Sequence, residues 1–164
     1  MSPVSQNQFH SSLGVKFTPD QIVAEIIRYM KDDDKRRYKI IIGTDSEAAL
    51  NNVDFVTAIV IHRVGNGGRY FWRRILANRF ATLRDRIWHE VLMSLDVAKD
   101  FVGLLQEQSE MPAFDFEVHI DVGENGATRD MIQELVGVVR ANNFEAKTKP
   151  DSYAASKVAD RHTK

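Results

Sequence analysis

The sequence predicts a mixed α/β fold in which five strands form one sheet, in the order 3-2-1-4-5, flanked by helices. Three observations support this. Three apolar segments joined by short links follow one another in the first half of the chain, which is typical of an antiparallel meander. The later apolar segments alternate with helical patterns, which favours parallel pairing through right-handed crossovers. The chain has 164 residues and 43% hydrophobic content, enough for one domain with a real core.

The N-terminal part contains an arm and a first helix. Residues 1–16 are expected to be a flexible arm or an edge extension, and residues 17–164 a single domain. Thr18 and Pro19 predict the start of a helix, because threonine caps a first turn and proline fits it. Apolar residues then recur at helical spacing at Ile22, Ile26, Ile27 and Met30.

The rest of the chain alternates between strand and helix patterns. The expected strands are residues 38–44, 55–62, 70–75, 116–121 and 144–149, and the expected helices are residues 82–108, 129–140 and 150–164. Gly65-Asn66-Gly67-Gly68 predicts a hairpin turn between the second and third strands. Asn142-Asn143 suits the end of the helix before them.

Composition limits the kinds of site and the location. The chain has no cysteine, so a metal site must use oxygen or imidazole ligands, which favours Mg²⁺ or Mn²⁺. No apolar run is long enough to span a bilayer and no secretory signal precedes the domain, so we expect no membrane contact and a cytoplasmic location. The net charge is −1, yet seven arginines and one acid lie within residues 63–86. This segment either faces phosphates or supplies solvated surface positions.

Four carboxylates have positions that suit a metal site. Asp45 and Asp121 each follow an apolar strand, and we expect both at the C-terminal ends of adjacent parallel strands. Glu90 lies at the edge of the apolar stripe of the long helix, and Asp160 lies in the last helix. Each also has an ordinary explanation, as a strand-end cap, the start of a loop or a solvated helix residue. Together, converging carboxylates form a negative pocket that divalent cations neutralise.

The element order and three motifs resemble a known family. Ile42-Gly43-Thr44-Asp45-Ser46, His119-Ile120-Asp121-Val122-Gly123 and Lys149-Pro150-Asp151-Ser152-Tyr153 with Val158-Ala159-Asp160-Arg161 are similar to the YkuK-type family of the ribonuclease H-like superfamily. The resemblance runs from Phe17 to the end of the sequence. It implies a ribonuclease H-like fold.

The resemblance also implies a function. Asp45, Glu90, Asp121 and Asp160 would be the catalytic residues and would hold two Mg²⁺ or Mn²⁺ ions, with Asp45 bridging both. The candidate substrate-binding residues are Ser46, Arg73, Asn125 and Lys149. The expected activity is hydrolysis of RNA, an RNA–DNA hybrid or a branched nucleic acid. The alternative is a non-catalytic module that binds nucleic acid or a protein partner, as a monomer or as a homodimer.

Overall fold

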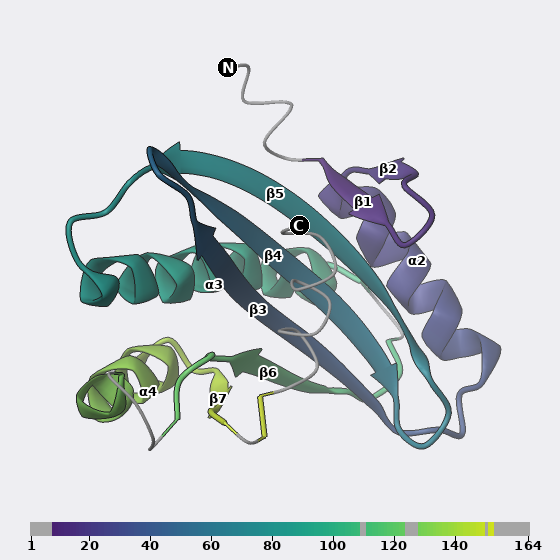
Figure 1. Cartoon of the computed structure of the whole chain (residues 1–164). Helices are drawn as coiled ribbons and strands as arrows, with labels where there is room; N and C mark the ends of the chain where they lie inside the picture. The colour runs from purple at the N-terminus through teal and green to yellow at the C-terminus, as the bar shows by residue number, and fades with distance from the viewer. Residues whose placement is uncertain (1–7, 109–110, 124–127, 150, 153–164) are drawn as a thin grey trace.

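The computed structural model describes residues 8–108, 111–123, 128–149 and 151–152, and these residues build one twisted sheet with helices packed on it (Figure 1). The strands are β1 (Phe9–Ser11), β2 (Lys16–Phe17), β3 (Tyr38–Ala48), β4 (Asn52–Arg63), β5 (Gly68–Asn78), β6 (Asp115–His119) and β7 (Glu145–Lys147). The helices are α2 (Pro19–Asp32), α3 (Leu83–Gln106), the 3-10 turn η1 (Arg129–Met131) and α4 (Ile132–Ala141).

The sheet contains the predicted five strands and two more. Its order is β2-β1-β5-β4-β3-β6-β7, so the expected order is confirmed for the last five, and the mixed α/β class with it. The expected count was wrong because β1 pairs with β5 and β2 pairs with β1. Phe9 explains this extension, since its ring is 1% exposed and meets Phe101 of α3 at 6.1 Å between centroids. One aromatic residue therefore ties the polar N-terminal segment to the core.

The meander is longer than the sequence indicates, and this moves Asp45. β3 and β4 pair from Tyr38 opposite Arg63 to Ala48 opposite Val53. Asp45 therefore lies inside β3, opposite Val56, and the prediction that it ends the strand was wrong. The physical reason is that buried residues of β4, including Val53 and Val56, hold β3 in register beyond its apolar half.

The helices begin and end where local chemistry predicts. The Thr18 side chain accepts from the Gln21 backbone, and the Thr18 backbone N–H donates to the Gln21 side-chain oxygen, which is a complete capping box. Thr82 caps α3 by accepting from the Asp85 backbone at 3.1 Å. Asn143 adopts φ 67° just after α4, as expected for asparagine at a helix end.

The main core lies between the three helices and one face of the sheet. Members of the core come from α2, α3 and α4 and from alternate sheet residues such as Ile40, Ile42 and Val118. The opposite face carries a smaller apolar group around Ile41 and Ala58. The expected helix after Pro150 lies outside the described residues. None of the helices in the described part of the chain combines the length and the apolar composition needed to cross a bilayer.

Candidate functional site

Two of the predicted acids lie side by side at one edge of the site: Asp45 in β3 and Asp121 just after the parallel strand β6. β3 and β6 run parallel, with Gly43 opposite His119. Asp45 and Asp121 each lie two residues further along, so the register brings them to the same level of the sheet. The backbone N–H of Ser46 donates to the Asp45 carboxylate at 2.9 Å and helps to fix its direction. The expected pairing of Asp45 with Asp121 therefore follows from the strand register, although neither residue is the last of its strand.

Glu90 approaches these acids from α3. Its side chain is 7% exposed, and the Ser46 hydroxyl donates a hydrogen bond to its carboxylate. Glu90 also lines a small cavity together with Asp121 and His119. The helix face that carries Ile87 and Val91 is buried against the sheet, so the amphipathic pattern of α3 brings Glu90 to this place. The sequence placed Glu90 at the edge of that face, and the structure agrees.

A chain of buried hydroxyls fixes α3 on the sheet beside the acids. The Thr44 hydroxyl lies 2.7 Å from the Ser94 hydroxyl and 2.9 Å from the Thr57 hydroxyl. These contacts join α3 to β3 and β4, one helical turn after Glu90. Buried hydroxyls without partners would be costly, so the three groups specify how the helix is seated.

Replacing Ser94 by Ala is expected to lower the free energy of unfolding by about 1–2 kcal/mol, because the buried Thr44 hydroxyl loses one of its two hydroxyl partners. Urea denaturation of parent and variant measures the difference. Ser12→Ala, at an exposed position, is the matched control and should change stability by less than about 0.5 kcal/mol. Equal effects of the two changes would show that the hydroxyl chain does not seat the helix.

The pKa of Glu90 is raised strongly at this site. Burial is the largest cause, and the charges of Asp45 and Asp121 add to it, so that the pKa rises from 4.5 to about 8. The hydrogen bond from Ser46 and the charge of Arg86 act in the opposite direction. At neutral pH the Glu90 carboxyl is therefore largely protonated in the folded protein. Burial, together with the charges of two neighbouring carboxylates, therefore favours the neutral form of Glu90.

Lys149 contacts the site through Asp121. Its ammonium lies 2.9 Å from an Asp121 carboxylate oxygen, and its backbone N–H donates to the carbonyl of Val122 at 2.8 Å. A Cβ atom on Gly123 would lie 3.2 Å from Cβ of Lys149, so glycine allows this close approach. Lys149 thus neutralises one acid of the pocket.

A second polar pair lies on β6 next to Asp121. The Nε2 atom of His119 lies 3.0 Å from a Glu117 oxygen, and Lys39 lies 3.5 Å from the other oxygen. Burial lowers the pKa of His119, against the effect of Glu117. Burial alone would raise the pKa of Glu117, yet the bond from His119 and the charge of Lys39 lower it overall. A neutral His119 therefore donates from Nε2 to an ionised Glu117.

Comparisons with known proteins now decide the family. The model of the family described as "Ribonuclease H-like" matches residues 21–164. The chain belongs to the ribonuclease H-like family. It is also similar to the uncharacterized protein YkuK of Bacillus subtilis (strain 168), with 31% identity over 166 residues that cover 95% of this chain and 96% of that protein.

The ribonuclease H-like fold brings some of the predicted site residues together. Asp45, Glu90, Asp121, Ser46 and Lys149 are connected by the contacts described above. Arg73 lies elsewhere: its guanidinium is 4.9 Å from the ring centre of Phe9, and the charges of Asp96 and Asp100 act on it. Asp160 and Asn125 lie outside the described residues.

The donor chemistry of this site fits a hard divalent cation, although its side chains have other partners. Asp45, Glu90 and Asp121 supply only oxygen atoms, which Mg²⁺ and Mn²⁺ prefer. Within the described ranges no three acidic or histidine side chains are arranged to hold a metal ion. The Glu90 carboxyl accepts from Ser46, and Asp121 is paired with Lys149. An incoming cation would therefore have to displace a proton from Glu90 and the ammonium of Lys149 from Asp121.

Two contributors to the site were not predicted from the sequence. Arg86 acts on Glu90 from four residues earlier in α3, a spacing at which helix residues are neighbours. Ser94 lies four residues after Glu90 and anchors the helix. Helical spacing from Glu90 would have found both residues. Nothing local in the sequence indicates that Lys149 pairs with Asp121.

Proposed function

We propose that this chain is a metal-dependent nuclease that hydrolyses phosphodiester bonds in RNA, an RNA–DNA hybrid or a branched nucleic acid. The observation that carries the proposal is the convergence of three carboxyl groups: Asp45 and Asp121 lie at the same level of the sheet, and Glu90 is buried beside them, where burial and then the charges of the two acids raise its pKa to about 8. Such mutual repulsion among carboxylates is relieved by a bound divalent cation. Membership of the ribonuclease H-like family supports the same reading.

The acids have distinct proposed roles. Asp45 would contact both of two Mg²⁺ or Mn²⁺ ions, Glu90 and Asp121 would hold one of them, and Asp160 the other. When bound, the ions would activate the attacking water and stabilise the charge on the leaving oxygen.

The neighbouring side chains would orient these acids. Ser46 positions the Glu90 carboxyl through its hydrogen bond. Lys149 neutralises Asp121 and, once displaced by a cation, becomes able to contact a phosphate oxygen.

The second candidate is a non-catalytic module with the same fold that binds nucleic acid or a protein partner. One observation favours it: Asp121 has an ammonium partner, and no metal-binding group of three side chains occurs in the part of the chain that the structure describes. In such a module Lys149 would be a permanent partner of Asp121. The module would show strongly salt-dependent nucleic-acid binding without cleavage.

Cleavage of labelled single-stranded RNA, an RNA–DNA hybrid and a four-way junction in Mn²⁺ separates the two candidates. The parent protein is expected to cut at least one substrate, and a chelator should stop the reaction. Asp45→Asn and Asp121→Asn should both lose the activity. Cleavage that survives both changes would come from a contaminant and, like no cleavage, would favour the binding module.

A further inference from the structure

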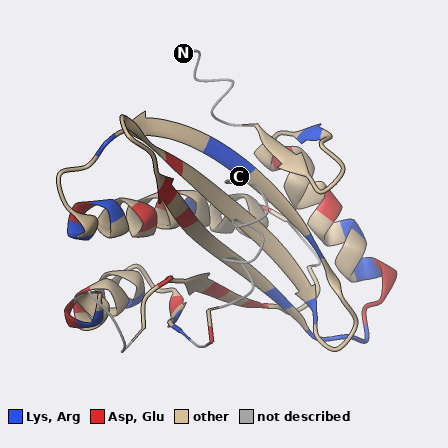
Figure 2. Cartoon of the chain, in the orientation of Figure 1, with Lys and Arg blue, Asp and Glu red and all other residues tan. Residues whose placement is uncertain are grey.

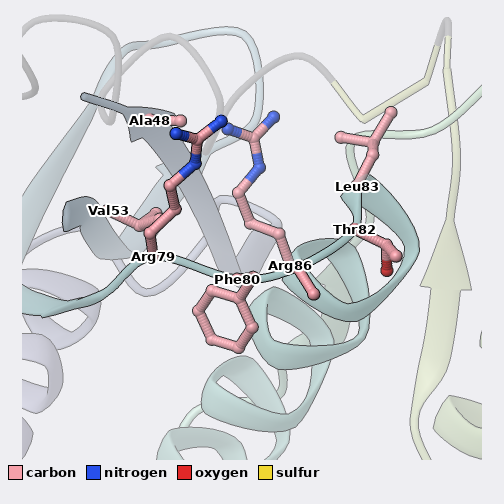
Figure 3. Close-up of a pocket in the computed structure, with 8 residues that line it drawn as sticks. Ala48, Val53, Arg79, Phe80, Thr82, Leu83 and Arg86 are labelled. Carbon is pink, nitrogen blue, oxygen red and sulfur yellow. The ribbon is translucent and has the colours of Figure 1, made fainter. Parts of the chain in front are cut away.

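A pocket next to the candidate site contains two arginines that converge. It lies where the β3–β4 turn meets the start of α3, has a volume of about 210 Å³ and opens to solvent. Its lining residues are Ala48, Val53, Arg79, Phe80, Ala81, Thr82, Leu83 and Arg86. Figure 3 shows the guanidinium groups of Arg79 and Arg86 pointing the same way at the mouth of this pocket. Two like charges in one pocket repel each other unless an anion lies between them.

The other arginines of the same basic segment are engaged elsewhere. Arg63 and Arg69 stack on the Tyr29 ring, at 4.1 and 4.9 Å from its centre. Arg74 pairs with Asp54, and Arg84 with Glu134. Arg73 faces Phe9. Five of the seven arginines between residues 63 and 86 thus have structural partners. The contacts described so far do not explain the positions of Arg79 and Arg86.

Among the described residues neither Arg79 nor Arg86 forms a salt bridge, although the charge of Arg86 acts on the Glu90 carboxyl. Within the part of the chain that the structure describes, Arg79 donates a hydrogen bond to the carbonyl of Leu50, at 3.3 Å. The Nε atom of Arg86 is buried and has no hydrogen-bond partner within the described chain. A buried guanidinium N–H without an acceptor is costly, and an acceptor bound in the pocket would remove that cost. Asp85, the acid in the first turn of α3, is exposed and does not line the pocket.

The pocket also includes the beginning of a long helix. α3 has 24 residues and starts at Leu83, and Thr82 and Leu83 both line the pocket. The backbone N–H groups and the dipole of a helix start favour a negative group. Figure 2 shows basic positions on the segment from β5 into α3, and acidic positions towards the C-terminal end of β3. An anion held by the arginines would therefore lie next to the acids.

We propose that Arg79 and Arg86 together bind one phosphate group of a nucleic-acid strand in this pocket. Planar guanidinium groups match phosphate oxygens with paired hydrogen bonds, and two of them supply enough positive charge for one phosphate. Arg86 lies one helical turn before Glu90, so the bound phosphate would be near the bond that the acid site acts on. The identity of the strand rests on the proposed function, whereas phosphate binding itself does not.

Binding of short RNA can be measured in the presence of a chelator, which removes divalent cations. This measurement tests the pocket in the absence of cleavage. Arg79→Gln and Arg86→Gln should each weaken binding by about ten-fold and lower the slope of log affinity against log salt by roughly 0.7, the value for one phosphate of a single strand. Arg84→Gln removes the same charge from the same helix and should change affinity by less than about two-fold. Equal weakening by all three variants would overturn the proposal, because only diffuse charge would then be involved.

Inorganic phosphate gives a second measurement that does not depend on RNA. The Nε–Hε NMR signals of Arg79 and Arg86 should shift and saturate with phosphate but not with chloride at matched ionic strength, and the Arg84 signal should stay unchanged. Absence of a saturating shift would overturn the phosphate site. Arg86→Lys, which keeps the charge, and thermal melts of each variant separate lost binding from lost folding.

Two comparisons define the result further. An arginine effect that requires a 5′-phosphate on the RNA would assign the pocket to a strand end, whereas an effect also seen with 5′-hydroxyl RNA would assign it to an internal phosphate. Arginine-dependent binding without cleavage in Mn²⁺ would support the pocket and overturn the nuclease. Cleavage without arginine-dependent binding would do the reverse.

Discussion

Replacing Asp45 by Asn is expected to lower Mn²⁺-dependent cleavage by about a thousand-fold or more. Asp45 is the acid proposed to contact both ions, and a metal ion contributes several kcal/mol of transition-state stabilisation. The amide has nearly the same shape, and the Ser46 backbone N–H can donate to its remaining oxygen as it does to the carboxylate. The variant should therefore fold while losing the site.

Metal binding can be measured separately from cleavage. At an Mn²⁺ concentration of a hundred times its dissociation constant, the parent protein should gain about 2.7 kcal/mol of stability. At the same concentration Asp45→Asn should gain only a small fraction of this amount. Asp96→Asn is the control, because Asp96 is an exposed acid of α3 whose loss changes net charge equally. Equal stabilisation of all three proteins by Mn²⁺ would show that the ions bind away from Asp45.

The sequence predicts most of the sheet because the turn motifs and apolar segments that specify its strands involve residues close together in the sequence. The Gly65–Gly68 turn between two apolar segments predicts a hairpin, and the structure has it. The extent of β3 could not be predicted, because aspartate and serine are poor strand formers by themselves. Pairing with the buried residues of β4 keeps Asp45 and Ser46 extended, and that pairing involves residues about ten positions away.

The acid site was predictable in part for the same reason. Glu90 is found from helical spacing, and Asp45 and Asp121 from the apolar segments before them. The partners that set their charge state are distant in sequence: Ser46 reaches Glu90 across 44 residues. Two arginines of one basic segment could not be told from the other five before their neighbours were known. Local patterns thus place the acids, whereas tertiary contacts decide which of them are protonated, paired or accessible to an anion.

Replacing Glu90 by Gln is expected to stabilise the protein at high pH and to leave it nearly unchanged at pH 4.5. The folded protein keeps a proton on Glu90 up to about pH 8, whereas the unfolded chain releases it near 4.5. Between these values the folded state binds more protons, so the free energy of unfolding falls as pH rises, by up to about 1.4 kcal/mol per pH unit. Gln keeps an oxygen to accept the Ser46 hydrogen bond but cannot ionise.

The difference in unfolding free energy between Glu90→Gln and the parent protein should therefore grow from pH 4.5 to pH 8 and reach the order of 4 kcal/mol. Urea denaturation across this range measures it, and Asp96→Asn should show no such growth. A difference that stays constant with pH would mean that Glu90 is already ionised, and that burial and the neighbouring acids do not hold its proton. Saturating Mn²⁺ should remove most of the pH dependence of the parent protein, since a cation that replaces the proton stabilises the ionised Glu90. Loss of the pH dependence in Glu90→Gln together with no response of the parent to Mn²⁺ would identify a buried proton site that binds no metal, as expected of the non-catalytic module.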